Sequence, residues 1–329
     1  MSGEPTPAAG EKKPLLVNRK RQFPAIYFAL GLLVLFIVLF SIGNKGFLSA
    51  YNVRNIGMSA SILLAVGLGQ VCTILTGGID LSVGGLMSLV SVLFMVLLPM
   101  VGYWAYPICI LVGVFAGYLN GNLLSRVRIP SFIATLGTGG IFVSVAYLIS
   151  PVAISAPKAI QPLLEIVNGT TFGVRNILII GALMFVGFLV LERYTIIGRH
   201  IFYVGSNVRM SWLSGLNVTR IKNVAFSLSG FGAAVAGIML ASRQYSGYPT
   251  IGTVYILNSI ATVVVGGTAM TGGAGGALNT LIGAIIMSVL QNGMTVVGID
   301  VYFQQTLLGL LIILSVAVTF DRSKLAIIK

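Results

Sequence analysis

The chain has 329 residues, of which 57% are hydrophobic and only 8% are charged, whereas typical soluble domains carry about 25% charged residues. Its mean hydropathy of +1.00 excludes a soluble globular protein. The net charge of +13 does not indicate nucleic-acid binding, because the basic residues cluster in polar gaps beside apolar segments, as the positive-inside rule predicts. We therefore predict an all-α, polytopic membrane protein that contacts the lipid bilayer and no nucleic acid.

Residues 1–22 form a polar tail that ends in basic residues, and we expect this tail to be disordered and cytoplasmic. Ten apolar segments follow. They are residues 25–42, 53–75, 86–100, 107–124, 132–150, 176–191, 224–241, 255–265, 277–294 and 303–320. Some are shorter than the roughly 20 residues that a crossing needs, so we predict about ten transmembrane helices, some of them discontinuous. The predicted domain spans 23–321, the tail 322–329 is cytoplasmic, and the basic segment 193–222 lies on the same side.

A glycine-rich break at 76–85 interrupts two of these segments and contains a carboxylate. Its candidate path residues are Thr76, Gly77, Gly78, Asp80, Ser82 and Gly84. A charge in lipid is costly, and irregular backbone is tolerated only where protein or a water-filled cavity surrounds it. The break therefore predicts a discontinuous helix that lines a path through the bilayer. Asp80 either caps the next helix or contacts substrate.

A second glycine-rich break begins at Gly266, Gly267 and Thr268 and runs to residue 276. Paired interrupted segments in two halves of a membrane protein are a sequence indicator of a transport path. We predict a repeat in which 53–124 corresponds to 254–320. The second break contains no carboxylate, so the two halves are not expected to be chemically equivalent.

Several kinds of chemistry have no residues to support them. The chain contains no phosphate-binding loop of the type that hydrolyses ATP. It has a single histidine, His200, and two cysteines within apolar segments, Cys72 and Cys109. These residues do not predict a metal site or a catalytic centre. Asp80 is the only acid well inside an apolar segment, so a proton relay is not expected either.

Five motifs occur in order along the chain. They are TGGIDLSVG at 76–84, IPSFIATLGT at 129–138, GR at 198–199 with VGSN at 204–207, LSGLNV at 213–218 and VVGGT at 264–268. Together they resemble the permease subunits of ribose-type ATP-binding-cassette (ABC) sugar importers, in the branched-chain amino acid and sugar permease superfamily. The resemblance runs from about residue 52 to residue 321.

The resemblance implies a type II-like ABC importer in the bacterial inner membrane. Its implied partners are cytoplasmic ATP-binding subunits, a second permease subunit and an extracytoplasmic substrate-binding protein. No cofactor is expected in this chain, because the partner ATPase binds ATP and Mg²⁺. The residues implied to couple the chain to that ATPase are Asn207, Arg209, Met210, Trp212, Leu213, Ser214 and Gly215.

A neutral polyol needs a wide cavity with weak hydrogen-bonding groups rather than a counter-ion. The candidate polar residues for such a path are Asn120, Asn258, Asn292 and Gln304, each of which could instead make a helix–helix hydrogen bond. The chain departs from the family pattern at Val143, at 256–260 and at Leu308, where charged residues are usual. A partner permease could carry the missing charges, which leaves open whether the permease dimer is symmetric.

The sequence leaves alternative functions open. An ABC permease could carry a nucleoside or another small polar metabolite. A secondary transporter or channel would work without an ATPase and would predict more ionisable groups inside the membrane. A membrane-embedded enzyme would need clustered His, Asp or Glu residues on facing helices.

Overall fold

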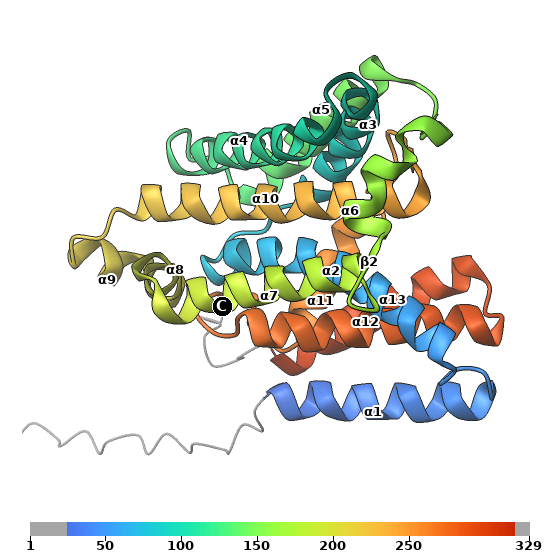
Figure 1. Cartoon of the computed structure of the whole chain (residues 1–329). Helices are drawn as coiled ribbons and strands as arrows, with labels where there is room; N and C mark the ends of the chain where they lie inside the picture. The colour runs from blue at the N-terminus through green and yellow to red at the C-terminus, as the bar shows by residue number, and fades with distance from the viewer. Residues whose placement is uncertain (1–24, 320–329) are drawn as a thin grey trace, which may run out of the picture.

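The computed structural model describes residues 25–319, and each of the ten predicted apolar segments is helical (Figure 1). The helices are α1 (Ala25–Gly43), α2 (Ala50–Leu75), α3 (Val83–Val101), α4 (Ala105–Ser125), α5 (Ser131–Ile149), α7 (Asn176–Tyr194), α10 (Val218–Gln244), α11 (Tyr255–Val265), α12 (Ala277–Val297) and α13 (Val301–Thr319). Within the described residues, seven helical stretches are long and apolar enough to cross a bilayer, and one of these, Val83–Ser125, contains both α3 and α4. The fold is therefore a polytopic helical membrane protein, as the sequence predicts.

The connections contain shorter elements. They are η1 (Gly102–Trp104), β1 (Ile154–Ser155), η2 (Lys158–Leu164), α6 (Glu165–Asn168), β2 (Thr170–Thr171), β3 (Val174–Arg175), α8 (Ile196–Ser206), α9 (Val208–Leu213) and β4 (Ser246–Gly247). Strand β1 pairs with β4 in antiparallel register, and β2 pairs with β3. The all-α prediction omitted these strands because a two-residue strand has no alternating pattern to detect.

The bundle has two ends, which we call the α8–α9 end and the opposite end. At the α8–α9 end, the Glu192 carboxylate of α7 meets the first residue of α12, Ala277. At the opposite end, the last residues of α1 and α12 meet, because a Cβ added at Gly43 would lie 3.1 Å from Val297. Helix α1 therefore begins at the α8–α9 end. Helix α13 follows α12 after a three-residue connection and runs back toward the α8–α9 end.

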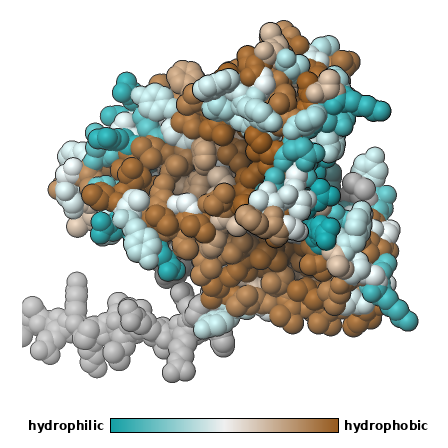
Figure 2. Space-filling view, viewed as in Figure 1, coloured by the Kyte–Doolittle hydropathy of each residue, from teal (hydrophilic) through white to brown (hydrophobic). Residues whose placement is uncertain are grey.

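The buried core contains α2, α3 and α10, with α10 lying between α4 and α2 (Figure 1). Helix α2 is buried continuously from Ala60 to Leu75, and α10 from Gly232 to Ser242. By contrast, α1 and α5 expose large apolar side chains such as Ile42 and Leu148, which are 79% and 85% exposed. Figure 2 shows apolar side chains over the face where α1 and α12 lie. An apolar exterior of this extent is what a lipid-facing surface requires.

Small residues allow α4 and α10 to approach closely. Gly113, Gly117 and Gly121 lie four residues apart on one face of α4. A Cβ at Gly117 would overlap the carbonyl of Phe226, and a Cβ at Gly113 would overlap the side chain of Ala234. In membranes, helices associate through this kind of backbone-to-backbone packing, because lipid removes the hydrophobic driving force between them.

This packing predicts that Gly117→Val lowers the free energy of unfolding of the purified protein by about 1–3 kcal/mol, since the added atoms have no space. The matched control is Gly137→Val on α5, where a Cβ meets nothing within 4 Å. The stability of both variants is measured by thermal unfolding in detergent, monitored by size-exclusion chromatography. Equal stability of the two would contradict the assigned α4–α10 contact.

Candidate functional site

The first break begins with a tight helix C-terminus at the end of α2. Gly77 has φ +78°, its N–H donates to the carbonyl of Ile74 at 2.9 Å, and the Gly78 N–H donates to the carbonyl of Thr73 at 3.0 Å. This is the Schellman pattern, in which a glycine adopts the left-handed conformation and the last helical carbonyls are satisfied.

The second break repeats that pattern at the end of α11. Gly267 has φ +96°, its N–H donates to the carbonyl of Val264 at 2.9 Å, and the Thr268 N–H donates to the carbonyl of Val263 at 3.1 Å. Two helices then follow each break, α3 and α4 after the first and α12 and α13 after the second. The local geometry and the order of elements agree with the predicted repeat.

Asp80 lies inside the first break with only 1% of its surface exposed. One carboxylate oxygen accepts the backbone N–H of Ser82 at 2.9 Å and the Ser82 hydroxyl at 2.6 Å. The other oxygen accepts the hydroxyl of Ser229, on α10, at 2.7 Å. Ser82 occupies the N-cap position of α3 without a capping bond from its own side chain. Asp80 therefore supplies the hydrogen bond at the start of α3.

Side chains from other helices bind the polar groups of the same break. The Asn120 amide, on α4, donates to the Ser82 hydroxyl at 2.8 Å. Gln70, on α2, bonds both backbone groups of Asp80 when its amide oxygen faces the Asp80 N–H. On α5, Ser131 and Thr135 accept the N–H groups of Ile79 and Leu81 at 3.1 and 2.9 Å. Irregular backbone in the protein interior is thus satisfied by side chains from two helices, α2 and α5, while α4 binds the Ser82 side chain.

Glycines at the start of α3 provide close contacts rather than polar ones. A Cβ at Gly84 would lie 2.6 Å from the Gly252 carbonyl oxygen and would overlap Ile256 of α11. The Ser88 hydroxyl, one turn later, accepts the Gly252 N–H at 2.9 Å. The start of α3 is therefore packed directly against the segment that leads into α11.

The second break has a carboxylate partner that its own sequence lacks. Glu192, on α7, is 9% exposed, and one of its oxygens accepts the Ala277 N–H at the start of α12 at 2.8 Å. A Cβ at the preceding Gly276 would lie 2.7 Å from that oxygen. Each helix that resumes after a break thus begins at a carboxylate, from Asp80 in one case and from α7 in the other.

Contacts within the second break also hold its backbone. Gly266 packs against the backbone of Asn279, and the Thr268 hydroxyl accepts the Gly276 N–H at 3.3 Å.

A cavity of about 540 Å³ with both polar and apolar lining residues lies between α11, α12 and α13. Asn258 and Gln304 line it, together with Thr253, Gln291, Thr295 and Gln305. The other two candidate path residues lie elsewhere. Asn120 is fully buried beside Ser82, and the Asn292 side-chain oxygen accepts the Asn52 amide at 2.8 Å.

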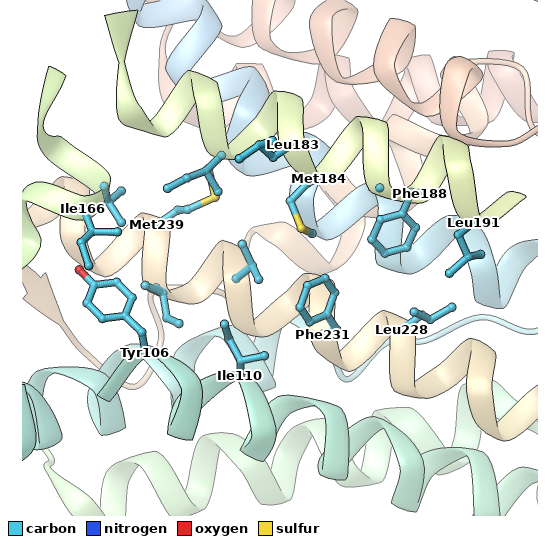
Figure 3. Close-up of a pocket in the computed structure, with 15 residues that line it drawn as sticks. Tyr106, Ile110, Ile166, Leu183, Met184, Phe188, Leu191, Leu228, Phe231 and Met239 are labelled. Carbon is cyan, nitrogen blue, oxygen red and sulfur yellow. The ribbon is translucent and has the colours of Figure 1, made fainter. Parts of the chain in front are cut away.

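A second cavity, of about 490 Å³, is lined by apolar residues of α4, α6, α7 and α10 (Figure 3). Phe188 and Met184 face Phe231 across it, and Tyr106 lies at one end. The Tyr106 hydroxyl already donates to the Leu163 carbonyl at 2.8 Å. A polyol placed here would lose hydrogen bonds to water without replacement, so this groove is a poor candidate for a sugar path.

The predicted coupling segment begins at Asn207, which joins α8 to α9, and contains all of α9 and the turn that follows. The Asn207 side chain accepts the Met210 N–H at 2.9 Å and caps α9, and Gly215 ends the turn with φ +82°. Met210, Trp212 and Leu213 are 59–68% exposed, and Arg209 and Ser214 are exposed beside them. The structure thus presents an apolar and cationic helix at the α8–α9 end.

Sequence reasoning missed Gln70, Ser131, Thr135, Ser229 and Glu192. Ser131 and Thr135 lie in the motif at 129–138, so that motif was the available signal for their position. The others are ordinary polar residues within or beside apolar segments, and only the fold shows what they contact. Among residues 25–319, no three His, Cys, Asp or Glu side chains gather in a way that could bind a metal ion.

Comparison with known proteins places the chain in a family. A family model described as "Branched-chain amino acid transport system / permease component" matches residues 52–316. The ribose import permease protein RbsC of Bacillus subtilis is 35% identical over 306 residues, which cover 90% of this chain and 92% of the relative. The corresponding protein of Haemophilus influenzae is 32% identical and covers 86% and 90%.

The fructose import permease protein FrcC of Rhizobium meliloti is also similar, with 35% identity over 90% of this chain and 84% of the relative. No solved structure matches the chain. Because the family model covers most of the chain and these relatives are similar over most of both sequences, the chain belongs to the family of branched-chain amino acid transport system permease components.

Proposed function

We propose that the chain is the membrane subunit of an ABC importer that carries a sugar or a similarly small neutral polyol. The observation that carries this proposal is the cavity between α11, α12 and α13, whose polar side chains are amides and hydroxyls, with no charged residue among those that line it. Neutral groups of this kind bind a polyol weakly enough for it to leave again. The names of the ribose and fructose import relatives support a monosaccharide.

The energy for transport comes from cytoplasmic ATP-binding subunits, which bind the ATP and Mg²⁺. Support for this partner comes from α9, where Trp212, Met210 and Leu213 are exposed beside Arg209. Exposed aromatic, Met and Arg side chains are typical of the centre of a protein interface. A second permease subunit and an extracytoplasmic substrate-binding protein complete the proposed importer.

The α8–α9 end faces the cytoplasm of a bacterial cell, with the chain in the inner membrane. The basic residues at this end support that orientation; they are Arg193, Arg199, Arg209, Arg220 and Lys222. Since α1 begins and α13 ends toward the same side, both termini are cytoplasmic in this proposal. The tails at 1–22 and 322–329 lie outside the described residues.

Asp80 acts as a cap that fixes the break rather than as a substrate contact. Its two oxygens are occupied by Ser82 and Ser229, and its side chain is almost fully buried. The cavity that Asn258 lines is formed by α11, α12, α13 and the residues that precede α11, and Asp80 is not among its lining residues.

The central test is purification of the chain with the products of its neighbouring genes, followed by reconstitution in proteoliposomes. We expect an ATPase and a binding protein to co-elute, and radiolabelled sugar to accumulate only with binding protein outside and ATP inside. Uptake without any ATPase would instead indicate a secondary transporter or channel. A thermal shift of the binding protein with nucleosides, but not with sugars, would identify the alternative cargo.

The cavity assignment predicts that Asn258→Leu lowers the apparent affinity for the transported sugar by about tenfold, the effect of losing one or two hydrogen bonds. Gln244→Leu, at the exposed end of α10 and outside the cavity, is the matched control. Uptake measured over a range of sugar concentrations separates affinity from maximal rate. Identical kinetics of both variants would remove Asn258 from the path.

The capping role predicts different outcomes for two substitutions of Asp80. Asp80→Asn keeps an oxygen for the Ser82 N–H and can donate to the Ser229 hydroxyl, so we expect nearly normal uptake. Asp80→Ala leaves buried groups without partners, and we expect stability to fall by about 1–3 kcal/mol. Thermal unfolding and uptake are measured on the same preparations. Loss of uptake in a normally stable Asp80→Asn protein would show that the charge itself is required.

A further inference from the structure

The second break is hydrogen-bonded to the helix end that leads into the first break. The Gly273 N–H, in the second break, donates to the carbonyl of Leu75, the last residue of α2, at 3.0 Å. Leu75 immediately precedes the first break, so the end of one interrupted helix is tied to the loop of the other.

The last turn of α8 lies against this hydrogen bond. A Cβ at Gly205 would overlap the Leu75 carbonyl and would lie 2.7 Å from the Gly273 nitrogen. A Cβ at Gly273 would lie 2.6 Å from the Ser206 hydroxyl and 2.8 Å from its Cα. Three backbone segments therefore touch here, and the only side chain at the contact is the short one of Ser206.

The same turn of α8 leads into α9 through a single residue. The Asn207 N–H closes the last turn of α8 by donating to the Tyr203 carbonyl at 3.1 Å, and the Asn207 side chain caps α9. One residue thus belongs to both helix ends, which leaves little freedom for α9 to move without α8.

The start of α8 is connected to the second break as well. Thr195 caps α8 by accepting the Gly198 N–H at 3.0 Å, and Gly198 packs against the backbone of Leu191 and Glu192. Glu192 in turn caps α12 at Ala277. Helices α7 and α8 therefore contact the second break at two separated points, Gly276 and Gly273.

We propose that the last turn of α8, at Gly205 and Ser206, is the positioning element that transmits a displacement of α9 to both breaks at once. This inference rests on the proposed function, in which a partner ATPase moves α9. Close-packed backbone is poorly compressible, so a movement of α9 is passed to Leu75 and Gly273 together. Gly205 is a positioning residue here, because it contacts neither substrate nor nucleotide.

The first test uses the wild-type complex with its ATPase and compares hydrogen exchange with and without a non-hydrolysable ATP analogue. We expect protection to change in three segments together, 205–213, 75–82 and 266–276, because a displacement of the last turn of α8 alters the solvent access of all three. A change confined to 205–213, or one that reaches a single break, would overturn the proposal. Failure of any ATPase to bind the wild-type chain would overturn the proposed function instead.

The second test compares Gly205→Ala with the control Gly187→Ala on α7, where a Cβ meets nothing within 4 Å. We expect Gly205→Ala to keep ATP hydrolysis within about twofold of wild type while uptake falls about tenfold or more, which is the size of a typical coupling effect. The Gly187→Ala control should retain uptake. Wild-type coupling in Gly205→Ala, or hydrolysis and uptake that fall in equal proportion in assembled complexes, would contradict the proposal. If Gly205→Ala does not assemble, the exchange experiment decides.

Discussion

The constraint on which this structure depends is the satisfaction of backbone hydrogen bonds where two membrane helices are interrupted. In lipid an unpaired N–H or C=O group is costly, so each interruption needs protein partners for the groups that it frees. The ends of α2 and α11 solve this problem in the same way, with a glycine at positive φ and two short-range backbone bonds. Polar side chains of α2, α4, α5 and α10 bind the rest of the first break.

At the starts of α3 and α12, a carboxylate accepts a backbone N–H group. A carboxylate is favoured at a helix N-terminus by the free N–H groups and the helix dipole. Asp80 is local to its break, whereas Glu192 comes from α7, 85 residues away from Ala277. The halves are thus related in geometry but differ in which helix supplies the cap. Helix α7 therefore contacts the start of α12 through a side chain, whereas Gly205 of α8 contacts the end of α2 through its backbone.

Much of this architecture could be predicted from residue patterns. The ten apolar segments correspond to ten helices, and both glycine-rich breaks lie where predicted, because hydropathy and glycine clusters are local signals. Glu192 could not be assigned as a cap, since its partner is distant in sequence. Helices α8 and α9 were also not predicted, because a basic segment between two crossings is typical of a loop. Four candidate polar residues looked equivalent, yet only Asn258 and Gln304 line the cavity, because burial and neighbours depend on how the helices pack.

We infer that the two breaks are capped, rigid structures that move as units when α9 moves, rather than segments that lose their hydrogen bonds during transport. Electron cryomicroscopy of the complete importer, with and without a bound ATP analogue, tests this most directly. We predict that Asp80 and Ser82, and Glu192 and Ala277, stay within hydrogen-bonding distance, about 3 Å, in both states while α3 and α12 change their tilt relative to α10. Loss of either contact in one of the two states would contradict it.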